Sequence, residues 1–98
     1  MTIIYKYPLD MSKESTEIEI PSLSSFLHCA MQGDSPTLWF RVDTDMPMQK
    51  RTFRIIGTGQ TISEDPSVHL LHLGTVMDNT FVWHIFEENI FKGQEIGK

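Results

Sequence analysis

Basic residues gather in one stretch of this chain, and their chemistry is the easiest to interpret. Half of the eight Lys and Arg residues fall between Arg41 and Arg54, and residues 50–60 read Lys-Arg-Thr-Phe-Arg-Ile-Ile-Gly-Thr-Gly-Gln. Arginine presents a planar fork of donors, and glycine lets backbone N–H groups approach a ligand closely. The stretch therefore predicts either a pocket that binds an anion or a charged, solvated face.

The same stretch has the composition of a β-strand that ends in a flexible loop. Residues 52–56 favour a pleated strand, and residues 57–59, Gly-Thr-Gly, then supply backbone freedom. Because successive side chains of a strand face opposite sides, Arg51 and Arg54 point apart. Either they serve one pocket across an oligomer interface, or only one of them contributes to a site.

Four histidines invite a zinc interpretation: His28, His69, His72 and His84. His69 and His72 are three residues apart on an expected strand and so face opposite sides, which argues against shared ligation. We expect the histidines to fill half-buried strand positions, and we assign no metal and no cofactor.

A catalytic constellation is not evident either. Cys29 is the single cysteine, and cysteine is among the most buried residue types, so we expect it to pack in the core rather than act as a nucleophile. The adjacent acids Glu87-Glu88 and Glu64-Asp65 lie in polar stretches, where such pairs are usually solvated surface. We therefore assign no catalytic residue.

Length and composition narrow the class of protein. Ninety-eight residues with 40% hydrophobic and 21% charged side chains predict one globular domain over residues 1–98, small enough that a homo-oligomer is expected. The formal net charge of −5 argues against a nucleic-acid polymer or an anionic membrane as partner. With one cysteine and no apolar leader or spanning run, we expect a cytoplasmic protein.

Hydrophobic alternation between turn signals predicts an all-β fold, mostly antiparallel, arranged as a small sandwich or a flattened barrel. The expected strands are residues 2–9, 16–20, 23–32, 37–42, 50–56, 68–77 and 80–86. Residues 23–32 also fit a helix of about two turns, so an α+β fold with one short helix is the alternative. Residues 87–98 are mixed, and we expect them to fray.

Four motifs together resemble a family of small bacteriophage and prophage proteins. They are Ile-Tyr-Lys-Tyr-Pro-Leu at 4–9, Leu-Trp-Phe-Arg-Val-Asp at 38–43, the stretch at 50–60, and Phe-Val-Trp-His-Ile-Phe-Glu at 81–87. In that family histidine usually follows Gly-Thr-Gly, so Gln60 is a departure. Residues 23–32 also depart slightly.

Those proteins are similar in turn to phage anti-Thoeris sponges, which oligomerise and hold cyclic ADP-ribose-type signals or cyclic oligonucleotides without cleaving them. The resemblance implies a homo-oligomeric protein that is not an enzyme, that sequesters a small anionic nucleotide in the host bacterial cytoplasm and that so counters bacterial immunity. It implies these ligand-binding residues: Trp39, Arg41, Arg51, Phe53, Arg54, Gly57, Thr58, Gly59 and Trp83. The alternatives are a phage inhibitor that contacts a host enzyme directly, and a small enzyme whose site is assembled between subunits.

Overall fold

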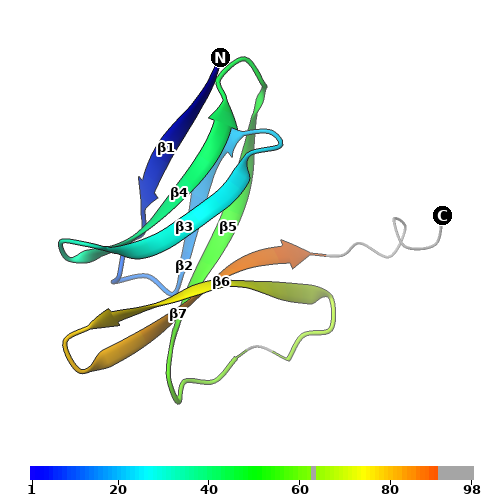
Figure 1. Cartoon of the computed structure of the whole chain (residues 1–98). Helices are drawn as coiled ribbons and strands as arrows, with labels where there is room; N and C mark the ends of the chain where they lie inside the picture. Colours follow the sequence, from blue (N-terminus) through cyan, green and yellow to red (C-terminus); the bar gives the residue numbers. More distant parts are fainter. Residues whose placement is uncertain (63, 91–98) are drawn as a thin grey trace.

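The chain folds into seven β-strands (Figure 1). The computed structural model describes residues 1–62 and 64–90, and over these ranges it contains no helix. The strands are β1 (Thr2–Pro8), β2 (Ser15–Pro21), β3 (Ser25–Gln32), β4 (Ser35–Asp43), β5 (Met48–Gly57), β6 (Val68–Asp78) and β7 (Phe81–Ile90). The expected all-β class is confirmed.

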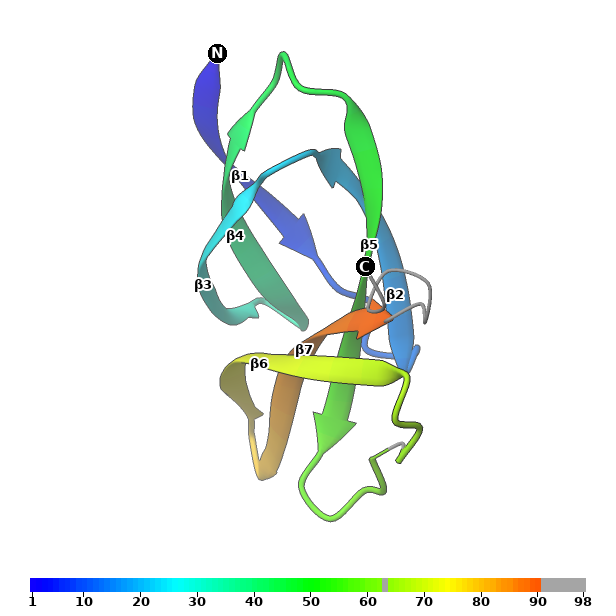
Figure 2. The same cartoon turned by 90° about the vertical axis from the view of Figure 1, so that its right-hand side faces the viewer.

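The strands form two antiparallel sheets. One has the order β1-β4-β3 and the other the order β2-β5-β7-β6. Turned by 90°, the chain shows β1, β4 and β3 beside β2 and β5, with β6 and β7 crossing below them (Figure 2). The molecule is therefore a small sandwich with a strongly twisted second sheet.

The core lies between the two sheets. Alternate residues of β4 (Leu38, Phe40 and Val42) face alternate residues of β5 (Phe53 and Ile55), and the rings of Phe40 and Phe53 meet edge to face, with centroids 6.0 Å apart. This arrangement follows from strand alternation, because every second side chain of each strand points into the same layer. Ile20 of β2, Val76 of β6 and Ile85 of β7 belong to the same buried cluster.

One side of the sandwich is closed by its two irregular edges. β3 and β6 are edge strands in contact with each other, and each has a register shift, between Phe26 and His28 in β3 and between His72 and Gly74 in β6. Cys29 packs against the core and its Sγ atom occupies the space where Gly74 would carry a Cβ. Burial raises the pKa of the Cys29 thiol.

The structure corrects two expectations. The helical alternative for residues 23–32 is wrong, because residues 25–32 form β3. The last strand does not end at Phe86 but continues to Ile90, and Glu87 is buried rather than solvated, with only 6% of its surface exposed. The fraying expected for the last residues falls partly on residues 91–98, which lie outside the described part of the chain.

Candidate functional site

Two hollows meet at the end of β5, and Trp83 and Gln60 line both of them. The larger, about 490 Å³, is formed by Met11, Ser12, Lys13, Glu14, Ile55, Gln60, Thr61 and Trp83. The smaller, about 410 Å³, is formed by Gly57, Thr58, Gln60, Thr80, Phe81, Val82 and Trp83. Both volumes fall in the range of small-molecule sites. We name the pair the Trp83 hollow.

The loop that borders this hollow is fixed by its own hydrogen bonds. The Gln60 N–H donates to the Gly57 carbonyl at 3.0 Å, and the Gly57 N–H donates to Gln60 Oε1 at 2.7 Å. A Cβ at residue 57 would lie 3.0 Å from Trp83 Cζ3, so any larger residue there would require the ring to shift by a few tenths of an ångström. Gly59 has a φ of 90°, which other residues rarely adopt. The Gly-Thr-Gly-Gln sequence thus forms a tight turn against the Trp83 ring.

A short hydrogen-bonded chain holds Thr58 in place. His84 Nε2 lies 2.9 Å from Thr58 Oγ1, and His84 Nδ1 lies 3.1 Å from Thr75 Oγ1. His72 Nε2 reaches the same Thr75 hydroxyl at 3.3 Å. Both ring nitrogens of His84 are therefore engaged, and the histidine ties the loop after β5 to β7 and β6.

Aromatic rings supply the flat surface of the hollow. The Phe81 and Trp83 rings are stacked with centroids 5.9 Å apart and an angle of 30° between their planes. Phe81 is 61% exposed, whereas Trp83 is half-buried and packs against the core. Trp83 Nε1 is buried and has no hydrogen-bond partner among the described residues. Such a surface suits a planar ring, because a base can stack on any aromatic face.

Arg51 lies on the inner face of the second sheet, away from this hollow. It bonds Glu87 through Nε to Oε2 at 2.6 Å and through Nη2 to Oε1 at 2.7 Å. Its Nη1 donates to the Ser24 carbonyl at 2.8 Å, and the guanidinium lies 4.9 Å from the centre of the Phe40 ring. The cation is thus satisfied by protein groups between the two sheets.

Arg54 lies on the opposite face, as strand alternation predicts. Its Nη2 contacts Glu14 Oε1 at 2.7 Å and its Nη1 contacts Glu88 Oε2 at 3.1 Å. The pKa of Arg54 is raised, because burial lowers it less than the hydrogen bonds to Glu88 and Glu14 raise it. Glu14 also lines the hollow, so its carboxylate lies between the hollow and the Arg54 cation.

The structure therefore separates the residues that the resemblance implies. It brings Gly57, Thr58 and Trp83 to one hollow, beside Gly59 in the turn. Phe53 is fully buried in the core. Trp39 and Arg41 lie on the outer face of β4, where Trp39 is paired in register with His28 and Arg41 with Ser25.

Several residues that line the hollow were not singled out from the sequence, and three of them bear on its chemistry. Lys13 belongs to a loop that carries no sequence motif. It reaches the hollow because of the path that the chain takes from β1 to β2. Phe81 begins the motif at 81–87, and its exposure beside Trp83 depends on the tertiary structure. Gln60 was noted only as a departure, but its side chain folds back onto the turn, where Oε1 accepts the Gly57 N–H.

Other kinds of site find little support in the described ranges, 1–62 and 64–90. No three His, Cys, Asp or Glu side chains there are close enough together to hold a metal ion. Those ranges also hold no helix with the length and hydropathy that crossing a membrane would need.

The fold and hollow define a small two-sheet β-protein with a surface hollow beside Trp83. Residues 1–95 match the domain of unknown function DUF7352, and the chain belongs to that family. Comparison with curated proteins gave no match, and comparison with solved structures gave none either.

Proposed function

We propose that this protein is a non-enzymatic binding protein that holds a small anionic nucleotide in the Trp83 hollow. The observation that carries the proposal is the shared wall formed by Trp83 and Gln60, which has an aromatic stack on one side and a lysine on the other. A base and a phosphate need this pair of features: a flat apolar surface and a cation within reach.

The base is assigned to the smaller cavity. There the Phe81 and Trp83 rings supply stacking surface, and the side chains of Thr58, Thr80 and Gln60 supply hydrogen-bonding groups at its border. Stacking of a base on an aromatic ring contributes about 1–3 kcal/mol and tolerates any base. The Thr58 hydroxyl is already oriented by His84, so little ordering is needed when a ligand binds.

The phosphate is assigned to Lys13 in the larger cavity. Arg54 lies next to this cavity, on the far side of Glu14, and its Nη2 donor is occupied by the Glu14 carboxylate. The Glu14 side chain is 70% exposed, so it is free to turn into water when a phosphate replaces it on Arg54. Arg54 thus serves as a second cation that a ligand reaches by displacing Glu14.

For the biological role, we propose that the resemblance of four sequence motifs to those of bacteriophage proteins reflects a shared role. A phage protein that holds a nucleotide without converting it removes that signal from a bacterial immune response in the host cytoplasm. The rival is an inhibitor that contacts a host enzyme directly, for which the acidic net charge of −5 suits a basic partner.

Thermal unfolding in the presence of cyclic ADP-ribose and cyclic di-AMP tests the proposal. A ligand at one hundred times its dissociation constant adds about 2.7 kcal/mol to the free energy of unfolding. Trp83→Leu should abolish this stabilisation, and Trp39→Leu, the matched change at the other of the two tryptophans, should retain it.

Two results of this experiment would count against the proposal. No stabilisation by any cyclic or linear adenine nucleotide would refute it and favour the direct inhibitor. Recovery of a chemically altered nucleotide after heat denaturation would show that the protein is an enzyme. The hydroxyl of Thr58 beside His84 would then be the first candidate nucleophile and base to test by mutation.

A further inference from the structure

The free edge of β1 offers a row of backbone groups for pairing. The Thr44 N–H donates to the Met1 carbonyl at 2.9 Å, and the Leu9 N–H donates to the Pro36 carbonyl at 2.8 Å. Antiparallel ladders alternate, so the odd-numbered residues of β1 bond to β4. The even-numbered residues Thr2, Ile4 and Lys6 therefore direct their N–H and C=O groups toward the free edge.

The other three edge strands each carry a feature that discourages pairing with another chain. β3 and β6 have register shifts and pack against each other. β2 alternates the acidic residues Glu17 and Glu19 with apolar residues. β1 has regular register throughout, and its only charged side chain, Lys6, reaches across the sheet to Gln32 Oε1 at 2.7 Å. β1 is therefore the unprotected edge of the described fold.

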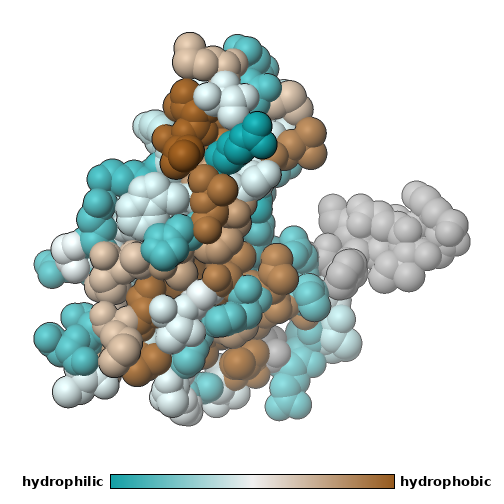
Figure 3. Space-filling model, in the orientation of Figure 1, coloured by the Kyte–Doolittle hydropathy of each residue, from teal (hydrophilic) through white to brown (hydrophobic). Residues whose placement is uncertain are grey.

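Apolar side chains stand exposed beside this edge. Ile4 is 65% exposed, Tyr5 is 55% exposed and Met48 is 57% exposed. A groove of about 290 Å³ runs along the inner side of β1, lined by Ile3, Tyr5, Tyr7, Glu19, Pro21, Val42, Thr44 and Met48. In Figure 3 apolar side chains gather over the upper part of β1. A strand added to this edge would cover them.

We propose that the occupant of this edge is β1 of a second copy of the chain, paired antiparallel about a two-fold axis at Ile4. The groove's single charged residue is Glu19, and its neighbour on the β2 face is Glu17, so an acidic strand would be repelled. The added strand must therefore be apolar and free of acidic residues. β1 itself fits this description, because it is extended and mostly apolar, and it carries one lysine and no acid.

The free backbone groups fix the register. With Ile4 opposite Ile4 of the second copy, Thr2 lies opposite Lys6 of that copy, and all three outward-facing residues pair. Ile3 then lies opposite Tyr5 on the inner face, where it covers the exposed ring beside the groove. Pro8, which has no N–H, falls outside the ladder. The two copies form one continuous sheet.

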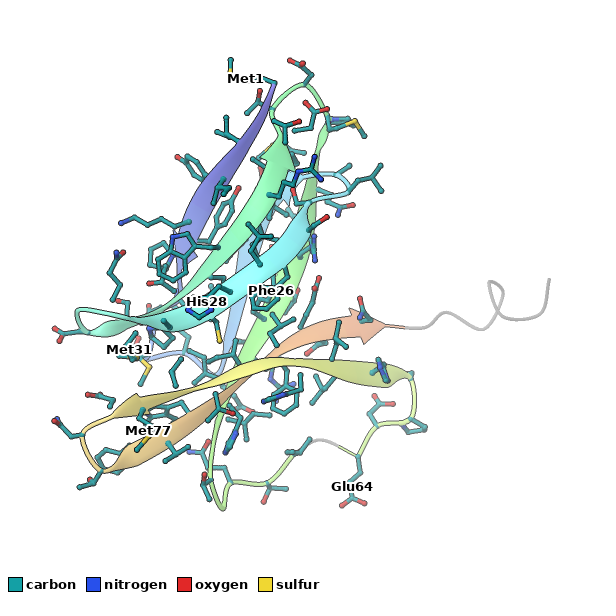
Figure 4. All side chains as sticks on the ribbon, viewed as in Figure 1. Met1, Phe26, His28, Met31, Glu64 and Met77 are labelled. Atoms are coloured by element: carbon teal, nitrogen blue, oxygen red, sulfur yellow. The ribbon has the colours of Figure 1, made fainter. Side chains whose placement is uncertain are left out.

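This interface is separate from the Trp83 hollow. Met1, next to the start of β1, lies at the opposite end of the molecule from Glu64 and Met77 (Figure 4). The dimer is therefore tested without any nucleotide, and its failure would leave the ligand proposal untouched.

Charge substitutions at the two-fold axis give the first test, read by sedimentation velocity over a concentration series. The wild-type chain should be dimeric, and Ile4→Lys and Ile4→Glu should each be monomeric, because like charges would face each other. An equimolar mixture of the two variants should again form dimers. Met77→Lys, a matched change at an exposed apolar residue of the β6 edge, should leave the dimer intact.

Disulfide formation gives the second test and reads the register directly. Directly opposite residues of a hydrogen-bonded pair have Cα atoms about 5.5 Å apart, which suits a disulfide. In a Cys29→Ala background, Ile4→Cys should cross-link into a covalent dimer on oxidation, and Lys6→Cys should not. A monomeric wild-type chain, Ile4 charge variants that remain dimeric, or cross-linking through Lys6→Cys alone would each overturn the proposal.

Discussion

Arg51 and Glu87 form a two-pronged ion pair between the sheets, with Nε to Oε2 at 2.6 Å and Nη2 to Oε1 at 2.7 Å. Glu87 is opposite Phe53 in the β5–β7 register, so its carboxylate lies in the same layer as the core. The guanidinium also contacts the Phe40 ring and the Ser24 carbonyl. One cation therefore joins β5, β7, β4 and the start of β3.

Breaking this pair should destabilise the fold strongly. Arg51→Met leaves the Glu87 carboxylate buried without its partner, and such a loss costs about 3–5 kcal/mol. The double variant Arg51→Met/Glu87→Leu should recover most of that loss, because no charge is then left buried. Urea unfolding of the single and double variants measures both effects. Lys50→Ala, at an exposed neighbour, should change the free energy of unfolding by less than about 0.5 kcal/mol.

The contact between Cys29 and Gly74 should tolerate no extra atom. Gly74→Ala places a Cβ on the Cys29 Sγ atom, and overpacking of this kind costs about 1–3 kcal/mol. Adding Cys29→Ala makes room, so Gly74→Ala/Cys29→Ala should be more stable than Gly74→Ala alone. Thermal unfolding monitored by circular dichroism compares the two. A double variant less stable than the single one would show that the strain lies elsewhere in the β6 bulge.

Removing the competing carboxylate should tighten nucleotide binding. Glu14→Gln weakens the contact with Arg54 Nη2, because a neutral amide replaces the carboxylate, and it removes one negative charge beside the Trp83 hollow. A unit charge about 6 Å away in water is worth about 0.7 kcal/mol, or about a threefold gain in affinity. Isothermal titration with cyclic ADP-ribose measures the change. Glu17→Gln, at a glutamate that contacts Lys50 instead, should leave the affinity unchanged.

Stability should fall in acid through three aspartates. Hydrogen bonds from Ser12 lower the pKa of Asp10, those from Asp45 and the N-terminus lower that of Asp43, and those from Ser67 lower that of Asp65, each from the ordinary 3.8. Because each pKa is lower in the folded state, the unfolded chain binds protons first as the pH falls.

The stabilising contribution is therefore complete above about pH 4 and is lost as the pH falls through the folded-state values. Melting temperatures measured from neutral pH downward should show this decline. Asp10→Ala should make the decline less steep, and an unchanged slope would mean that the Asp10–Ser12 turn adds nothing.

Strand positions were predictable because alternation is a local property. Each of the seven expected segments overlaps an observed strand, and the opposite orientation of Arg51 and Arg54 follows from their spacing alone. The end of β7 was missed because Glu87 and Glu88 look like solvated surface in isolation. They are strand residues because Arg51 and Arg54 lie close to them in the folded sheet.

The sequence by itself determined the positions of the strands, the turn at Gly57, Thr58 and Gly59, and the faces of the basic strand, because these depend on neighbouring residues. Only the tertiary structure decided which acidic residues pair with Arg51 and Arg54. Glu14, Glu87 and Glu88 are far from the arginines in sequence and meet them through the register of β2, β5 and β7. Sheet order likewise decided that Trp39 and Arg41 lie apart from Trp83, and that β1 is left with a free edge.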